Sequence, residues 1–322
     1  MRWVRRLFTL VALLVIGGGL ATVLRVSPQA EPTQRTTAPP GPLQDSGTAP
    51  LAGGGTAPSP LAVRLDLAGD PVSVRFKKPP ASALLFDLDT GRVLYRQEPT
   101  KVLPIASLTK MMTALVVVDR IKPGAKVRIT NEALRYQGSG VGLLPRGKWI
   151  GVNTMLYGLL LPSGNDAAIA LAQRAAGGSE QRFVRYMNEK AEAMGLLCTH
   201  FSTPSGFEDK DNHSCAADLA AIGRAVLRQP RLARIVSQRE AVVPFPIKGG
   251  RLYLYNHNPL LRQGYRGTTG LKTGYTDAAG RCLVATARRG PVKLGVVLLD
   301  SPDPSKQAMQ LLDRGFKASG AT

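Results

Sequence analysis

Short apolar runs separated by glycine turns occur near both ends of the foldable part of this chain. Residues 82–87 (SALLFD) and 92–97 (RVLYRQ) flank an Asp-Thr-Gly turn and predict a hairpin. Residues 270–276, 281–287 and 292–299 predict three successive strands, most simply antiparallel neighbours. We expect the hairpin and the three later strands to form one five-stranded antiparallel sheet. Because helices are predicted for the residues between them, the expected fold class is mixed α/β.

Helical patterns dominate the sequence between these two groups of strands. Residues 104–118 are apolar on almost every side, which predicts a helix that is buried nearly all round. Further helices are expected at residues 152–161, 166–176, 180–194 and, closing the chain, 306–316. The middle of the chain is therefore expected to form a helical lobe, with helices also flanking the sheet.

The first 65 residues differ in composition from the rest of the chain. Residues 1–26 join a basic start (MRWVRR) to a long apolar run, a pattern that indicates a signal peptide or a signal anchor in the membrane. Residues 27–65 are rich in Pro, Thr and Gly and predict a disordered linker. We expect one folded domain at residues 66–322, outside the cytoplasm in the cell envelope, either anchored in the membrane or secreted.

The formal net charge of +20 invites a nucleic-acid interpretation, but the basic residues are scattered along the chain. No zinc-finger spacing, RNA-binding aromatic signature or basic zipper is present, so no nucleic-acid partner, metal or cofactor is predicted. Attraction to anionic lipid or anionic wall polymer and a simple contribution to solubility both remain open.

The chain contains three cysteines, and the expected export would expose them to an oxidising compartment. Cys198 and Cys215 flank a polar, turn-rich loop, and an oxidising compartment favours a disulfide between them. Cys282 lies in an apolar run and is expected to be a small buried core residue.

Ser107 and Lys110 lie three residues apart at the start of the first long helix, so their side chains share one face. A helix start favours a developing anion, and an amine desolvated by apolar neighbours can take the proton of a serine hydroxyl. A Ser-x-x-Lys pattern alone is weak, because it recurs by chance in chains of this size. A capping serine beside a solvated lysine is the better explanation of an isolated match.

Two further patterns follow in order. Ser163-Gly164-Asn165 lies on a turn between two predicted helices, and Lys272-Thr273-Gly274 lies on a predicted strand. The ordered triplet resembles the penicillin-recognising serine enzymes. The surrounding segments PIASLTKMMTALV, LLLPSGNDAAIALA, STPSGFEDKDNHSCAADLA, NHNPLLR and GLKTGYTDAAGRCLVATA resemble the D-alanyl-D-alanine carboxypeptidases among the low-molecular-weight penicillin-binding proteins. This resemblance implies a β-lactamase/transpeptidase-like fold.

The resemblance also implies a role for each residue of the three motifs. Ser107 would be the acylated nucleophile, Lys110 its general base and Ser163 a proton relay to the leaving D-alanine. For substrate binding, Asn165 would hold the peptide carbonyl, Lys272 would give electrostatic support and Thr273 would contact the terminal carboxylate. Gly274 and Tyr275 would lie beside the oxyanion hole. The backbone amides of Ser107 and Tyr275 would form that hole. The implied partners are peptidoglycan stem peptides as substrate and β-lactam antibiotics as inhibitors.

One position departs from the family pattern. An arginine usually precedes the last helix and binds the substrate carboxylate, whereas Pro304 stands there in this chain. Lys306 and Arg281 are both possible substitutes.

Other functions of the same motif set stay open in the sequence. A serine β-lactamase needs an added glutamate, and Glu208 with Asn212 has a suitable spacing, although the segment around them matches the carboxypeptidases. A D,D-endopeptidase or transpeptidase differs only in the bond cut or in the acceptor. A receptor that senses β-lactams without turnover is the alternative from a different class.

Overall fold

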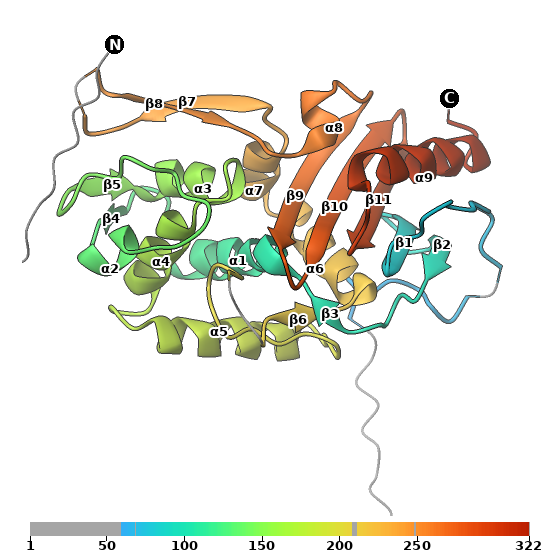
Figure 1. Cartoon of the computed structure of the whole chain (residues 1–322), viewed down its shortest axis with the longest axis horizontal. Helices are drawn as coiled ribbons and strands as arrows, with labels where there is room; N and C mark the ends of the chain where they lie inside the picture. Colours follow the sequence, from blue (N-terminus) through green and yellow to red (C-terminus); the bar gives the residue numbers. More distant parts are fainter. Residues whose placement is uncertain (1–58, 68, 208–210, 248, 322) are drawn as a thin grey trace, which may run out of the picture. The chain divides into compact units, whose positions relative to one another are not determined.

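The computed structural model describes residues 59–321 except 68, 208–210 and 248, and residues 56–322 form one compact unit. The expected signal segment and most of the expected linker lie outside the described residues. A mixed α/β fold with a five-stranded sheet is present, as predicted, and the structure shows that its strand order is β2-β1-β11-β10-β9 (Figure 1). All neighbouring strands pair antiparallel. The strands are β1 (Ser82–Asp87), β2 (Val93–Gln97), β9 (Thr268–Thr276), β10 (Gly280–Arg289) and β11 (Val292–Leu299).

Side chains alternate between two hydrophobic cores on opposite faces of this sheet. On one face, Leu85 and Val296 pack with Leu312 and Phe316 of α9 (Pro304–Ala318). On the other face, neighbouring residues such as Phe86 pack against the helical part of the chain. Figure 1 shows α9 on one side of the sheet and α6 (Ala216–Arg228) on the other. Both faces are therefore buried, which explains why the strands read as nearly continuous apolar runs.

A buried helix runs through the centre of the helical lobe, and Ser107 and Lys110 of the candidate site lie at its start. This helix, α1 (Lys110–Arg120), has every side chain from Lys110 to Val117 buried. It contacts α3 (Val152–Leu160), α4 (Asn165–Ala175), α5 (Glu180–Ala193) and α6. A helix surrounded in this way must be apolar all round, as its sequence is. The other short elements of the lobe are β3 (Leu103–Pro104), β4 (Lys126–Arg128), α2 (Asn131–Leu134), β5 (Trp149–Gly151) and β6 (His213–Ser214).

Two features were not expected from the sequence. The chain after α6 forms α7 (Pro230–Val236), a two-stranded hairpin of β7 (Glu240–Pro244) and β8 (Arg251–Tyr255), and α8 (Pro259–Arg262). Residues 61–65, assigned above to the linker, instead lie against the domain, because Leu61, Val63 and Leu65 pack on its core. The folded region therefore begins before residue 66. None of the helices within the described residues combines the length and the apolar character needed to cross a bilayer.

Candidate active site

Ser107 lies in a short 3-10 turn, η1 (Ala106–Thr109), that leads directly into α1. The residue before it, Ala106, has a positive φ of 48°, an uncommon conformation for a residue with a side chain. Ser107 itself is half-buried, whereas its neighbours Ala106 and Leu108 are buried. The turn therefore holds a single hydroxyl at the surface of a rigid, apolar support.

The amine of Lys110 contacts three oxygen atoms. Its Nζ lies 2.8 Å from Ser107 Oγ, 2.7 Å from Asn165 Oδ1 and 2.8 Å from the carbonyl oxygen of Ser205. Two of these oxygens, those of Asn165 and Ser205, can only accept a hydrogen bond. An uncharged amine has two N–H groups for these two acceptors, so its lone pair is left facing the hydroxyl proton of Ser107.

The electrostatic surroundings favour this uncharged form. Lys110 is fully buried, and burial holds its pKa well below the ordinary value, with the charge of Lys272 lowering it further and Asp166 opposing both. Burial also lowers the pKa of Lys272, to about 7. Desolvation penalises the charged form of each amine, and two nearby cations penalise each other. The site thus contains an amine that can accept a proton from a serine.

Strand β9 lies beside the Ser107 turn and forms one edge of the five-stranded sheet. A side chain on Gly274 would bring its Cβ to 2.9 Å from the carbonyl oxygen of Ile105 and 3.2 Å from the amide nitrogen of Ser107. Only glycine lets the strand approach this closely. The predicted Lys-Thr-Gly motif is therefore placed against the predicted nucleophile, with Lys272 buried and Tyr275 exposed at the strand's end.

The Ser163-Gly164-Asn165 motif forms the turn between α3 and α4, as predicted. Asn165 is buried, and its side-chain amide donates to the carbonyl oxygen of Gln137 while its Oδ1 accepts from Lys110. Ser163 has a positive φ of 65°, and its buried Oγ has no hydrogen-bond partner among the described residues. An unpaired buried hydroxyl is uncommon and frequently marks a functional position. Asn165 thus joins the site through Lys110, and Ser163 is left with a free hydrogen-bonding group.

Asp166 is a site residue that the sequence reasoning missed. It is fully buried at the start of α4, and its carboxylate accepts from the backbone amides of Val141 (2.8 Å), Gly142 (3.1 Å) and Ala167 (2.7 Å). Burial raises its pKa, while these hydrogen bonds act in the opposite direction. Asp166 therefore fastens the loop after Gln137 to the helix that carries Asn165. Its position directly after the Ser-Gly-Asn motif was the available signal.

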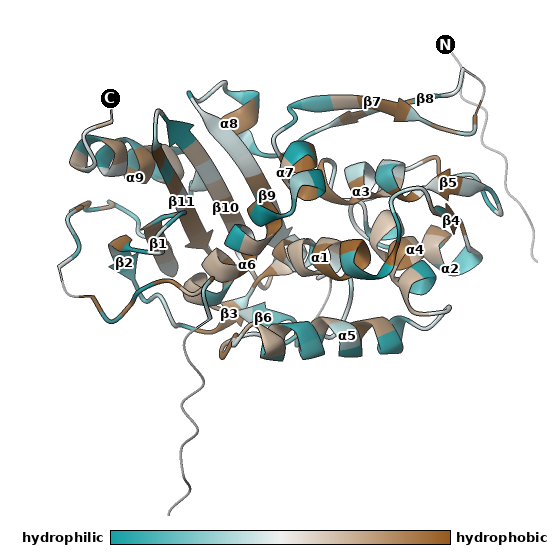
Figure 2. Ribbon diagram, turned by 180° about the vertical axis from the view of Figure 1, so that it is seen from behind, coloured by the Kyte–Doolittle hydropathy of each residue, from teal (hydrophilic) through white to brown (hydrophobic). Residues whose placement is uncertain are grey.

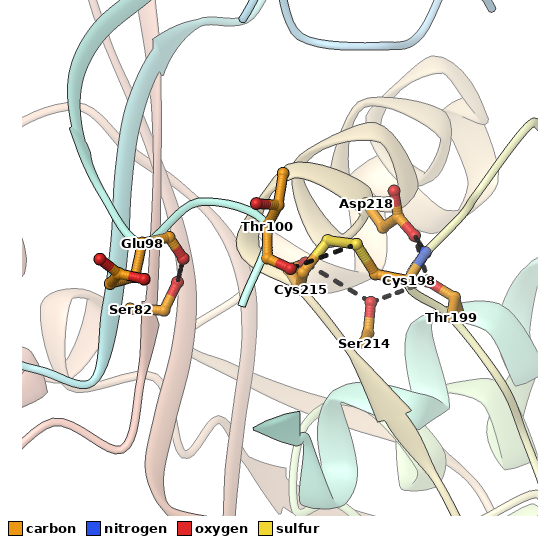
Figure 3. The surroundings of a disulfide bond; sticks show 8 residues. All are labelled: Ser82, Glu98, Thr100, Cys198, Thr199, Ser214, Cys215 and Asp218. Atoms are coloured by element: carbon orange, nitrogen blue, oxygen red, sulfur yellow. Dashed lines mark hydrogen bonds between the residues drawn. A yellow bond between two sulfur atoms is a disulfide. The ribbon is translucent and has the colours of Figure 1, made fainter. Parts of the chain in front are cut away.

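The loop that supplies Ser205 to Lys110 is held by the expected disulfide. Cys198 and Cys215 are bonded, with Cα atoms 5.5 Å apart. Figure 3 shows Asp218 of α6 beside this bond, where its carboxylate accepts from the Cys198 amide (2.7 Å) and from the Thr199 hydroxyl (2.7 Å). These contacts fix the two ends of the loop to α6.

The same loop is packed tightly against the nucleophile turn. Gly206 has a positive φ of 74°, and a Cβ there would lie 2.0 Å from the carbonyl oxygen of Ala106. Strand β6 near the end of the loop pairs with β3, which ends three residues before Ser107. Packing of the loop thus brings Gly206 against the nucleophile turn and the Ser205 carbonyl oxygen to Lys110, and the sequence assigned neither residue a role.

The possible substitutes for the family arginine differ in position. Arg281 pairs in register with Tyr275, so it lies at the end of β10 next to the candidate site. Its guanidinium donates to the carbonyl oxygen of Pro302 at 3.1 Å and is otherwise exposed. Pro304 and Lys306 belong to the first turn of α9, where the Lys306 amide donates to Asp303.

For the β-lactamase alternative, Glu208 lies outside the described residues, and Asn212 is buried with its Oδ1 accepting from the Ser202 amide.

Comparison with known proteins bears out the resemblance. The family model described as D-alanyl-D-alanine carboxypeptidase matches residues 76–303. A D-alanyl-D-alanine carboxypeptidase of Bacillus subtilis is 35% identical over 243 residues, which cover 73% of this chain and 61% of that protein. One of Mycobacterium tuberculosis is 36% identical over 246 residues, covering 74% of this chain and 82% of that protein. The chain thus spans less than two thirds of the length of the Bacillus relative.

Solved structures give the same result for the fold. The crystal structure of a Streptomyces DD-transpeptidase superposes with a TM-score of 0.71 at 30% sequence identity. The match covers 76% of this chain and all of the Streptomyces chain. The sheet and helical lobe described above are therefore the fold of the penicillin-recognising enzymes, as the motifs implied.

Proposed function

Because this chain belongs to the D-alanyl-D-alanine carboxypeptidase family, we propose that it is a serine peptidase that removes the terminal D-alanine from peptidoglycan stem pentapeptides. The observation that carries the proposal is the contact of 2.8 Å between the Ser107 hydroxyl and the buried amine of Lys110. A buried amine with a strongly lowered pKa is the group required to activate a serine at neutral pH.

In the proposed reaction, Lys110 takes the hydroxyl proton as Ser107 Oγ attacks the carbonyl carbon of the penultimate D-alanine. The amides of Ser107 and Tyr275 stabilise the negative charge on the carbonyl oxygen. The C–N bond then breaks, and the free hydroxyl of Ser163 relays a proton to the departing D-alanine nitrogen. Water hydrolyses the resulting ester and regenerates Ser107.

Recognition of the substrate falls to the open edge of β9 and the residues around it. Asn165 would hold the peptide carbonyl, and Thr273 the terminal carboxylate. We propose that Arg281 supplies the cation that the family pattern places before the last helix, because it pairs in register with Tyr275. Lys272 would add positive charge when protonated.

A β-lactam antibiotic presents an amide carbonyl and a carboxylate in a similar arrangement to the D-alanyl-D-alanine terminus. We expect it to acylate Ser107 and to leave a slowly hydrolysed ester. Residues 1–26 would direct the domain out of the cytoplasm and leave it anchored or secreted, so that it meets both peptidoglycan and antibiotic in the cell envelope.

The test is incubation with a diacyl-L-Lys-D-Ala-D-Ala peptide, with released D-alanine measured by mass spectrometry, together with labelling by a fluorescent penicillin. We expect both signals from the native chain and neither from Ser107→Ala. The matched control is Ser319→Ala, which removes an exposed hydroxyl at the end of α9 and should keep both. Continued penicillin labelling of Ser107→Ala would refute the assignment, because the acceptor oxygen would be gone.

Transfer of the acyl group to an amine is the second candidate, since a DD-transpeptidase has the same fold. The two reactions share the acyl-enzyme and differ in whether water or an amine resolves it. Mass spectrometry of pentapeptide-bearing wall fragments separates the products: a carboxypeptidase shortens stem peptides, a transpeptidase joins them, and an endopeptidase separates joined ones.

A further inference from the structure

A second concave site lies at the other end of the sheet from Ser107. It is a cavity of about 560 Å³, within the range typical of small-molecule sites. Its wall comprises Leu88, Asp89, Arg224, Leu227, Arg228, Ala233, Arg234, Ser237, Thr269, Arg288 and Lys293, and we call it the basic pocket. Helices α6 and α7 form much of its wall; Figure 2 shows α7 next to β9, while α6 packs against β1, β10 and β11. Thr269 and Gly274 are five residues apart on β9, so roughly 17 Å separate the pocket from the candidate active site.

Five cationic side chains line the basic pocket, against one carboxylate. Asp89 pairs with Lys293 at 3.0 Å. Within the described part of the chain, Arg228 and Arg234 form no ion pair and no side-chain hydrogen bond, and both are exposed. The Nε of Arg288 donates only to the carbonyl oxygen of Gly290, at 2.9 Å. These three guanidinium groups therefore retain free N–H donors and uncompensated charge.

Arg224 contributes a fixed charge from the floor of the pocket. It is 3% exposed, and its guanidinium donates to four carbonyl oxygens at 2.7 to 3.0 Å, those of Leu61, Ala62, Leu88 and Asp89. Carbonyl oxygens satisfy the donors without cancelling the charge. Burial and the neighbouring Arg228 lower the pKa of Arg224, while Asp87 and Asp89 act in the opposite direction. The result is a rigid cation in a concave site, where the field on an incoming anion is strongest.

The shape of the basic pocket and the residues that line it indicate which class of anion fits it. Guanidinium groups pair with phosphate through two parallel hydrogen bonds, so several of them in one cavity favour phosphate. The lining contains no aromatic side chain among the described residues, so bases of a nucleic acid would find no surface to stack on. Lipid headgroups in a bilayer lie in a plane and reach a concave site less well than a flexible chain does. Leu88, Leu227 and Ala233 offer apolar contact to the carbon skeleton between phosphates.

We propose that the basic pocket binds phosphate groups of a phosphodiester-linked anionic polymer such as a poly(polyol phosphate). Bound there, the polymer would hold the enzyme near its substrate while leaving the distant active site open. The proposed polymer binding does not require the peptidase reaction, so either can be disproved without the other.

The test measures binding of poly(glycerol phosphate) to the full chain by isothermal titration calorimetry at low and physiological salt. The test variant combines Arg228→Gln, Arg234→Gln and Arg288→Gln. The control combines Lys122→Gln, Arg185→Gln and Arg314→Gln, which removes the same charge from exposed positions outside the pocket. We expect a loss of affinity of at least about tenfold in the test variant and less than about twofold in the control, because close phosphate contacts outweigh distant charge.

Two further arms separate the sources of phosphate. The native chain is also titrated with phosphatidylglycerol vesicles and with a single-stranded oligonucleotide. Weaker binding of both than of the polymer supports the proposal. Equal losses of affinity in the two triple variants, or no loss in either, would overturn the proposal. Stronger binding of the vesicles or of the oligonucleotide than of the polymer would also overturn it. Penicillin labelling of the test variant at the native rate shows that the fold is intact, and melting temperature serves this purpose if the native chain is not labelled.

Discussion

Replacing Lys272 by methionine is expected to abolish activity and yet stabilise the protein in a pH-dependent way. Lys272 is 2% exposed, and its pKa falls from 10.5 to about 7 on folding. Its folded-state pKa is therefore below its unfolded value, so the unfolded chain binds more protons between about pH 7 and pH 10. In that window stability rises with pH. Below about pH 7 both states carry the proton, and the buried charge destabilises the fold by up to roughly 5 kcal/mol.

Methionine has a similar length and no charge, so Lys272→Met removes this penalty with little change in packing. At about pH 6 we expect the variant to be at least about 2 kcal/mol more stable than the native chain, and at about pH 10 the difference should nearly vanish. Removing the charge at position 272 also removes its electrostatic repulsion of the Lys110 amine. This effect increases the gain in stability at low pH. The measurement is urea denaturation of both proteins at the two pH values. A gain that is the same at both values, or a less stable variant at pH 6, would refute the reasoning.

Three further predictions concern the support of the site. Gly274→Ala should slow penicillin acylation at least about tenfold, measured by stopped-flow labelling, because its Cβ would force β9 away from the Ser107 turn; an unchanged rate would contradict the close approach. Replacing Cys198 and Cys215 together by alanine should lower the free energy of unfolding by roughly 2–4 kcal/mol, seen as a lower melting temperature that no longer responds to reductant. Asp166→Asn should destabilise the domain by roughly 2–3 kcal/mol in urea denaturation, since an amide replaces a carboxylate that accepts from three backbone amides; wild-type stability would show that these contacts are weak.

The strands and main helices could be predicted because their signals are local. The sheet strands are apolar runs bounded by glycine turns, and α9 has a clear apolar face. The hairpin of β7 and β8 was missed even though residues 251–255 alternate between exposed and buried. A two-stranded ribbon has weak patterning of its own, because it gains most of its stability by packing on a neighbour.

The chain order of three short motifs, together with the segments around them, was enough to predict the family, because these motifs are short runs of residues that can be read directly in the sequence. The sequence also predicted that Cys198 and Cys215 would pair, which the structure confirms. These properties depend on a residue and its near neighbours in the chain.

Only the tertiary structure decided what surrounds Lys110. Its contact with the Ser205 carbonyl joins residues 95 positions apart, and its contact with Asn165 joins residues 55 apart. The low pKa of its amine comes from complete burial and from Lys272 on a strand at the far end of the chain. The basic pocket likewise draws its cations from two helices and two strands. Burial, field and cavity shape are sums over neighbours in space, and a linear pattern does not contain those neighbours.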